Sequence, residues 1–288
     1  MKKYIFAGLI LSIINLLFAQ ELKAYACGVT KVAFMKELNS AFSKKFNIDV
    51  KSNKRGGDTF VIESVAKGDA HLGTGCRDIL ETSKDEKDVE SIQIAWGALT
   101  FIVNPKNSVD NLTTKQIKDI LIGRVTNWKE VGGANKPIHL IVRKPKKAGV
   151  ALSAKEVLFK NIHIDFYSKA KKVKNSYLLR ERVAKDPYAF AIDNVISASR
   201  FNGIKMLKVD GVEPTKENIL SHKYKMRQAL YLYLPKNPTN LASSYAKFAL
   251  SKEGQDVISK TGTANLAEAS GKDDEDNYMI QNLLMDLQ

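Results

Sequence analysis

The feature that most constrains the fold is a repeated unit: a short apolar strand, a turn rich in glycine, and an apolar or amphipathic stretch with helical spacing. The three expected strands are Leu22–Ala26, Ile48–Val50 and Ala70–Thr74. The turns that follow them are Gly28-Val29-Thr30, Arg55-Gly56-Gly57-Asp58 and Gly75-Cys76-Arg77. Repetition of strand, turn and helix predicts an α/β fold with mainly parallel sheets.

Several helices can be predicted from apolar spacing and from their end signals. One begins near Thr30 or Lys31, and another runs from Phe60 to about Gly68. A capped helix is expected over Thr113–Ile122, and the C-terminal region predicts one amphipathic helix over Leu241–Ile258. Helices between strands are the usual connections of a parallel sheet.

Two long apolar segments enclose the central part of the chain. They are Leu99–Val103 and Ala229–Leu234, and the shorter strands Ile138–Val142 and Ala189–Ile192 lie between them. The pair would suit crossovers between two lobes. A chain of this length exceeds the usual size of one core, so two lobes are the default expectation.

The N-terminus predicts export. Lys2 and Lys3 precede an apolar run from Tyr4 to Phe18, and cleavage is expected near Ala19. This run is shorter than the ~20 residues that a spanning helix needs, so no stable membrane insertion is expected.

The formal net charge is +14, which favours an anionic partner, although a basic surface that is simply solvated explains the same number. Nucleic acid is disfavoured because the protein is exported and has no compact basic tract with interleaved aromatics. The histidines have no metal-ligand spacing. No cofactor is expected.

The segments Asn104–Thr113 and Thr126–Gly133, with Trp128 inside the second, closely resemble the phosphate-binding proteins of phosphate ABC transporters. Gly211–Ile219 and Tyr224–Tyr233 resemble the same family in the same order. The resemblance therefore covers nearly all of the chain after the signal peptide.

The resemblance implies a two-lobed type II periplasmic binding-protein fold, in which two crossover strands form the hinge. The expected division is a signal peptide at 1–19, lobe 1 at 20–101 plus 235–288, and lobe 2 at 102–234. It also implies a periplasmic monomer, without enzymatic activity, that captures an inorganic oxyanion for an ABC permease or a membrane sensor. Neither the anion nor the choice between transport and sensing can be decided from the sequence.

A dehydrated oxyanion needs many donors at once, and backbone N–H groups at helix N-termini, hydroxyls and arginine can supply them. The candidate ligand-binding residues lie in the turns after strands, where ligands collect in open α/β sheets. They are Cys27, Gly28, Val29, Thr30, Arg55, Gly56, Gly57, Cys76, Arg77, Arg143, Lys147 and Gly149.

The chain departs from the family pattern at several of these positions. Lys147-Ala148-Gly149-Val150 replaces the usual Ser-Gly-Thr after the matched Arg143, and Arg55 and Cys76 replace serines. Arg77 stands where a phosphate-type aspartate would follow. Loss of that carboxylate would remove an acceptor for a protonated oxyanion and add a positive charge. The site should then prefer a more fully ionised, larger or differently shaped anion over hydrogen phosphate.

Cys27 and Cys76 are expected at the ends of neighbouring strands that face the cleft. Three interpretations stay open: a disulfide, thiol coordination of a soft ligand such as arsenite or a metal, or small buried residues in place of serines. A thiol redox protein is a weaker alternative because no Cys-x-x-Cys spacing occurs, and a basic surface adhesin is another. Arg143 could instead form a salt bridge in the cleft, and Arg77 could pair with Asp58 or Asp78.

Overall fold

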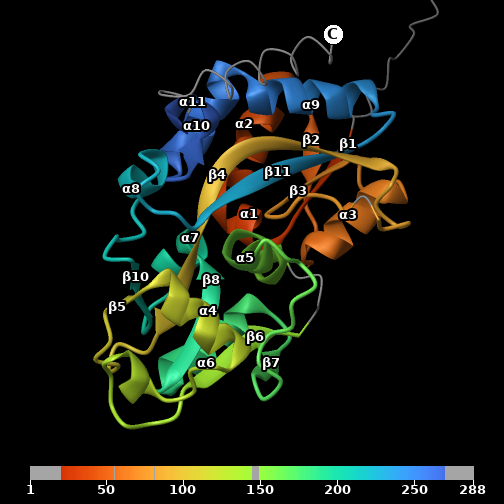
Figure 1. The fold of residues 1–288 in the computed structure, drawn as a ribbon. Coiled ribbons are helices and arrows are strands. Elements are labelled where there is room, and N and C mark those ends of the chain that lie inside the picture. The colour runs from red at the N-terminus through yellow and green to blue at the C-terminus, as the bar shows by residue number, and fades with distance from the viewer. Residues whose placement is uncertain (1–20, 55, 81, 145–148, 270–288) are drawn as a thin grey trace, which may run out of the picture.

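The computed structural model of this protein describes residues 21–269 except 55, 81 and 145–148 (Figure 1). The predicted signal peptide lies outside the described residues, and so do Arg55 and Lys147. Within the described part, no helix combines the length and the apolar character that crossing a membrane requires.

One strand connects the two ends of a long sheet whose order is β2-β1-β3-β11-β4-β8-β6-β7. Strand β4 (Val89–Val103) pairs with β11 (Arg227–Pro235) up to Ala98, and from Leu99 onward it pairs with β8 (Ala189–Asn194). We call residues 21–98 with 227–269 the discontinuous half, and residues 99–226 the continuous half. Figure 1 shows the discontinuous half above the continuous half, with β4 passing from one to the other.

The discontinuous half is built from both ends of the described chain. Its other elements are β1 (Glu21–Ala26), β2 (Asp49–Lys51), β3 (Leu72–Gly75), β12 (Ala264–Asn265), α1 (Gly28–Thr30), α2 (Lys36–Phe46), α3 (Asp58–Ala66), α9 (Asn240–Leu250), α10 (Lys252–Lys260) and α11 (Leu266–Ala269). A π-helical turn over Lys31–Met35 joins α1 to α2, so this helical path begins at Gly28, slightly earlier than the apolar spacing predicts. All three predicted strands of this half are present.

The continuous half carries the second part of the sheet. Its other elements are β5 (Asn111–Leu112), β6 (His139–Arg143), β7 (Lys171–Val173), β9 (Lys205–Met206), β10 (Lys208–Val209), α4 (Thr114–Ile122), a 3₁₀ turn (Trp128–Val131), α5 (Gly149–Phe159), α6 (Ser176–Lys185), α7 (Val195–Ser199) and α8 (Lys216–Leu220). The capped helix predicted here is confirmed: Thr113 and Gln116 form a capping box, and Gly123 ends the helix at φ 80°.

Parallel pairing is confirmed at the outer strands of each half. β1 pairs in parallel with β2 and β3, and β6 pairs in parallel with β7 and β8. The strands between them, β4 and β11, run antiparallel to their neighbours. Each half therefore contains both parallel and antiparallel pairs, since β4 and β11 run antiparallel to the strands beside them.

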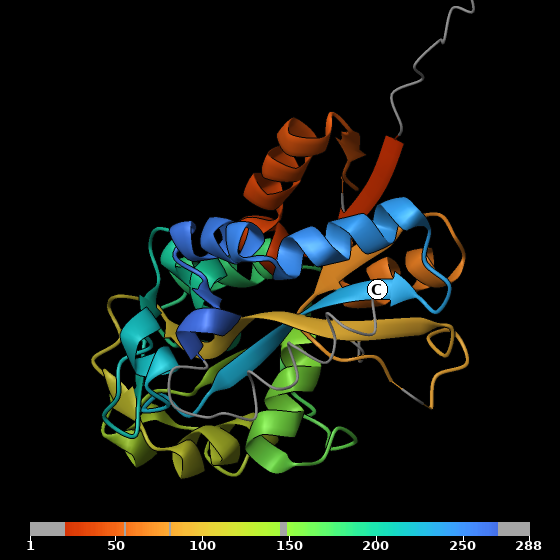
Figure 2. The same ribbon diagram turned by 90° about the horizontal axis from the view of Figure 1, so that it is seen from above.

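Helices cover both faces of the sheet. Phe101 and Ile102, adjacent on β4, belong to two separate apolar clusters, because successive side chains on a strand point to opposite faces. Figure 2 shows the C-terminal helices α9 and α10 beside the N-terminal helix α2. There the Phe42 ring lies 4.9 Å from that of Tyr245 and 5.6 Å from that of Phe248, which ties the two ends of the chain into one core.

The helix predicted over Leu241–Ile258 is in fact two helices, α9 and α10. Ser251 separates them with φ −66° and ψ 159°, and its hydroxyl accepts from the Gly254 N–H at 3.2 Å. Apolar side chains keep helical spacing across the break, so spacing alone could not reveal the cap.

The predicted division into lobes remains a prediction, and the strand pairing favours earlier boundaries. The partner of β4 changes between Ala98 and Leu99, not after residue 101. All of β11, from Arg227 to Pro235, pairs within the discontinuous half.

Candidate functional site: a cleft between the two halves

A cleft of about 530 Å³ is lined by residues from both halves. The discontinuous half contributes Cys27, Gly28, Val29, Gly56, Gly57, Asp58 and Cys76. The continuous half contributes Arg143, Gly149, Val150, Asn175, Ser176, Tyr177, Arg180 and Ser197. A cleft of this size is typical of sites for small ligands.

Within the described residues, the N-terminal ends of five helices line this cleft. They are those of α1, α3, α5, α6 and α7, and each contributes residues from its first turn or its N-cap. The first N–H groups of a helix have no partner inside it, and the helix dipole places partial positive charge there. The cleft therefore offers backbone donors and a positive potential, which suit an anion.

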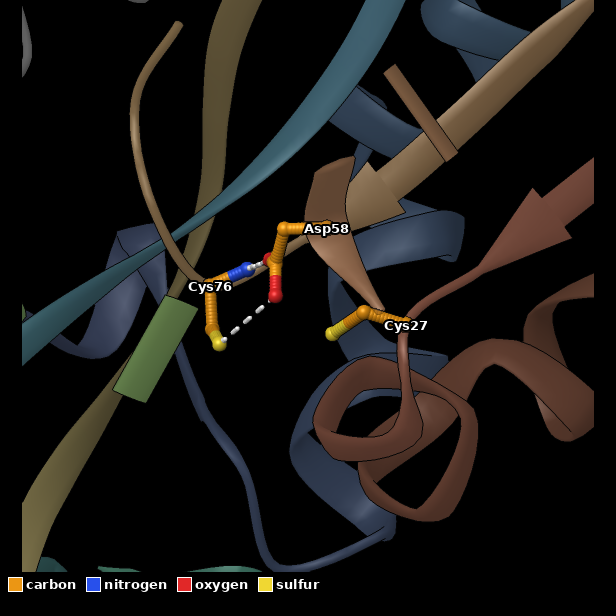
Figure 3. Close-up of side chains that lie close together, drawn as sticks. All are labelled: Cys27, Asp58 and Cys76. Atoms are coloured by element: carbon orange, nitrogen blue, oxygen red, sulfur yellow. Dashed lines mark hydrogen bonds between the residues drawn. The ribbon is translucent and has the colours of Figure 1, made fainter. Parts of the chain in front are cut away.

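The wall from the discontinuous half brings two thiols and a carboxylate together. Strands β1 and β3 pair with Ala26 opposite Thr74, and the Cys27 N–H donates to the Thr74 carbonyl at 2.9 Å. Cys27 and Cys76 thus end neighbouring strands, as the sequence predicts. The two sulfurs and a carboxylate oxygen of Asp58 all lie within 4.8 Å of one another (Figure 3).

Asp58 fixes the position of Cys76. The Cys76 N–H donates to Asp58 Oδ1 at 2.6 Å, and the Cys76 thiol donates to Oδ2 at 3.7 Å. Both cysteines are buried free thiols. A hydrogen bond with the Cys27 thiol, burial, and the negative charge of Asp58 raise the pKa of the Cys76 thiol well above its ordinary value. The Cys76 thiol is therefore protonated at neutral pH.

Gly149, the first residue of α5, brings the continuous half against this cluster. A Cβ at this position would lie 2.3 Å from Asp58 Oδ2 and 2.7 Å from Cys76 Sγ. Because no real Cβ approaches a neighbour so closely, only glycine allows the end of α5 to lie against the two side chains.

The wall from the continuous half presents arginine. Arg143 ends β6, and its Nη1 donates to Ser176 Oγ at 2.6 Å, while its Nε is buried without a hydrogen-bond partner. Arg180 Nη1 donates to Asp193 Oδ2 at 3.1 Å. Burial raises the pKa of Asp193 to about 6, against the attraction of Arg180. The Arg180 Nε is also buried without a partner among the described residues, so both guanidinium groups of this wall keep a donor that is open to a ligand or a water.

The structure places eight of the predicted site residues at the cleft: Cys27, Gly28, Val29, Gly56, Gly57, Cys76, Arg143 and Gly149. Arg55 and Lys147 lie outside the described residues. The Thr30 side chain is buried next to the cleft wall and does not line it. Its hydroxyl donates to the Thr74 carbonyl at 3.2 Å and lies 3.6 Å from Cys27 Sγ.

The structure directs Arg77 away from the cleft. Its Nη1 and Nη2 donate to the two carboxylate oxygens of Glu86 at 2.9 and 2.7 Å, and both side chains are almost fully buried. Its partner is therefore Glu86, whereas the sequence suggested Asp58 or Asp78. Asp78 contributes only its backbone carbonyl, which accepts from Nη1 at 2.7 Å.

The sequence suggested that the site lacks a carboxylate, but Asp58 supplies one. This residue follows the two glycines of the second turn and reaches the cleft from the first turn of α3. Sequence reasoning also missed the cleft residues Val150, Asn175, Ser176, Tyr177, Arg180 and Ser197. Asn175 could have been found, because an asparagine before an apolar helical run is an N-cap signal, and its side chain does accept from the Leu178 N–H.

Comparison with known proteins agrees with this architecture. A family model described as the PBP superfamily domain matches residues 31–253. The chain belongs to the PBP superfamily. The resemblance to phosphate-binding proteins is confirmed by its relatives, of which the Borreliella burgdorferi phosphate-binding protein PstS is 27% identical over 66% of this chain and 71% of its own length.

Further members of the PBP superfamily show the same relationship. The Bacillus subtilis phosphate-binding protein PstS is 23% identical over 70% of this chain and 66% of that relative. A solved Clostridium perfringens structure, assigned as a phosphate ABC transporter substrate-binding protein with bound phosphate, is 26% identical with a TM-score of 0.75. It covers 85% of this chain and 99% of that one, and it confirms the predicted α/β fold of this superfamily.

Proposed function

We propose that this protein is an exported solute-binding protein that captures phosphate, or an anion of similar shape, in the cleft. The observation that carries the proposal is the convergence of five helix N-termini on one cavity, together with Arg143, whose Nε has no partner among the described residues. The phosphate-binding relatives support phosphate as the first anion to test. Delivery would be to an ABC permease or a membrane sensor in the periplasm, and the protein would act as a monomer.

The charges in the cleft explain how a small anion could be held. Arg180 is paired with Asp193, so among the described residues that line the cleft Arg143 supplies the positive charge that is not already paired with a carboxylate. A guanidinium and several backbone N–H groups can together replace the water around an oxyanion. Asp58 adds carboxylate lone pairs that could accept from a protonated oxyanion. Closure of the two lobes about β4 and β11 would bring these groups together.

The test is a thermal-shift titration of the protein without residues 1–19 against phosphate, arsenate and sulfate. A ligand of the folded state raises Tm by an amount set by its concentration over Kd. We expect phosphate to stabilise the protein, and Arg143→Gln to weaken phosphate binding roughly 10- to 100-fold, since a hydrogen bond to a charged group contributes about 1.5–3 kcal/mol.

The matched control is Arg124→Gln. The Arg124 side chain is 76% exposed and lies 3.8 Å from Asp119, outside the residues that line the cleft. The Arg124→Gln variant should bind phosphate with the wild-type affinity. Absence of stabilisation by all three anions, or equal losses in the two variants, would count against anion capture at this site.

A further inference from the structure

We propose that Cys27, Asp58 and Cys76 form a binding site for a thiophilic divalent metal ion such as Zn²⁺. The site lies on the wall of the cleft from the discontinuous half. It goes beyond the proposed capture of an anion and does not depend on it. Two thiolates and a carboxylate are ligands that Zn²⁺ accepts in proteins, and three protein ligands leave the fourth position open towards the cleft.

The geometry suits tetrahedral coordination. With Zn–S distances of about 2.3 Å and a Zn–O distance of about 2.0–2.2 Å, the ligand atoms lie roughly 3.5–3.8 Å apart. Cys76 Sγ and Asp58 Oδ2 are already 3.7 Å apart, and all three ligand atoms lie within 4.8 Å. The longest separation would have to shorten by about 1 Å at most, which small side-chain rotations allow.

The three ligands come from separate elements whose positions are fixed by the backbone. Cys27 follows β1, Cys76 follows β3, and Asp58 begins α3. Pairing of β1 with β3 sets the two thiols side by side, and the Cys76 N–H to Asp58 Oδ1 hydrogen bond orients the carboxylate. Figure 3 shows the three side chains pointing towards one another. The donors are therefore organised before any metal binds.

The charges are compatible with an anion in the same cleft. Metal binding releases a proton from each thiol, adds two positive charges, and leaves the formal charge of the cluster unchanged. The metal and an anion on Arg143 thus do not exclude each other by charge.

A disulfide between the two cysteines is the competing use of the same sulfurs. It would need the sulfurs at about 2.05 Å, and it would leave Asp58 only its hydrogen bond from the Cys76 N–H. In the structure both thiols are free, and the carboxylate contacts Cys76 through both oxygens. A carboxylate held against a pair of thiols is what a metal site requires.

The test is a titration of the reduced protein with Co²⁺ at pH 8 in a phosphine reductant, followed by displacement with Zn²⁺. We expect one Co²⁺ per chain with a sulfur-to-cobalt charge-transfer absorption that Zn²⁺ abolishes. Calorimetry in buffers of different ionisation enthalpy should give two protons released per metal. Affinity should rise with pH, because both sulfurs must lose their protons to coordinate the metal.

Variants separate this site from the anion site. Cys27→Ser and Cys76→Ser should each weaken Co²⁺ binding and reduce the charge-transfer absorption per bound Co²⁺ to about half or less, because one thiolate is lost. Asp58→Asn should weaken Co²⁺ binding. Arg143→Gln should keep the wild-type Co²⁺ affinity and absorption. The proton count uses the wild-type chain, so the proposal remains testable if a cysteine variant fails to fold.

Reduced wild-type protein with two titratable thiols and no charge-transfer absorption would overturn the metal site, as would an absorption that keeps its full wild-type intensity in either cysteine variant. Phosphate stabilisation without this absorption would refute the metal site alone. The absorption without phosphate stabilisation would refute anion capture alone.

Discussion

The two walls of the cleft share a backbone plan and differ in their side chains. On each wall, helices begin directly at the cavity and present their N-terminal ends. The discontinuous half adds two thiols and a carboxylate, whereas the continuous half adds guanidinium, amide and hydroxyl groups. The common backbone suits anions in general, so the side chains must decide which ligand binds and on which wall.

The same contrast separates two arginines that occupy similar places in the two halves. Arg77 follows β3 and Arg143 ends β6. Glu86 occupies both terminal nitrogens of Arg77, whereas Arg143 donates to the neutral hydroxyl of Ser176. The Nε of each arginine is buried without a partner among the described residues, so the terminal nitrogens make the difference. A position at the end of a strand is therefore not enough to make an arginine a ligand residue. A nearby carboxylate decides whether the guanidinium is already paired or is left for a ligand.

The largest expected effect tests whether Arg77 is structural. Arg77→Met removes one partner of a buried ion pair and should lower the free energy of unfolding by roughly 3–5 kcal/mol, because Glu86 is left buried and charged. Phosphate affinity at a temperature where the variant is folded should match wild type. Chemical denaturation and the anion titration measure the two quantities.

The control for this prediction is the double variant Arg77→Met/Glu86→Leu. It should recover much of the lost stability, since an apolar pair of similar volume can replace a buried ion pair. A phosphate affinity lowered tenfold in Arg77→Met would instead return Arg77 to the site.

The second prediction concerns Asp193, the buried partner of Arg180 in the continuous half. Because burial raises its pKa from 3.8 to about 6, the native state binds this proton more tightly than the unfolded state. The resulting stability is fully present below about pH 4, is lost as the pH rises through about 6, and amounts to roughly 3 kcal/mol. Asp193→Asn should remove this component from the free energy of unfolding measured by urea between pH 4 and 8.

Asp110 provides a control of opposite sign. A hydrogen bond from Lys205 lowers the pKa of this exposed carboxyl. Its stabilising contribution is present above its unfolded pKa and is lost as the pH falls. Asp110→Asn should therefore leave the Asp193 component in place. A pH profile of Asp193→Asn that coincides with wild type would refute the assignment.

The smallest expected effect tests the contact between the walls. Gly149→Ala forces a methyl group onto Asp58 and Cys76, and overpacking of this kind costs roughly 1–3 kcal/mol. Co²⁺ binding should weaken in parallel, because two ligands are displaced. Gly28→Ala is the matched control, since a Cβ there meets nothing within 4 Å. Equal Tm values for the two variants would show that α5 does not press on the cluster.

The sequence was most informative where a backbone rule applies. Apolar runs and glycine turns predicted β1 and β3, and the fold implied by the family resemblance then predicted Cys27 and Cys76 as neighbours, which the pairing of the two strands bears out. The same reasoning failed for Arg77, because its partner Glu86 lies beyond a turn whose path no local pattern specifies. Arg180 was missed for a related reason: its place at the cleft depends on how α6 packs on β8, which carries Asp193. Periodicity predicts which face of a helix is buried but not which cavity its end reaches.

The shared strand β4 also has a consequence for the order of folding. The continuous half is one uninterrupted stretch, so its contacts can form without the remainder of the chain. The discontinuous half needs β11, which inserts between β3 and β4 only after residue 227 is available. Contacts so distant in sequence close late and slowly. As the chain emerges from a ribosome or a translocon, β3 must wait with an unpaired edge, and this interval is when the chain is most exposed to aggregation.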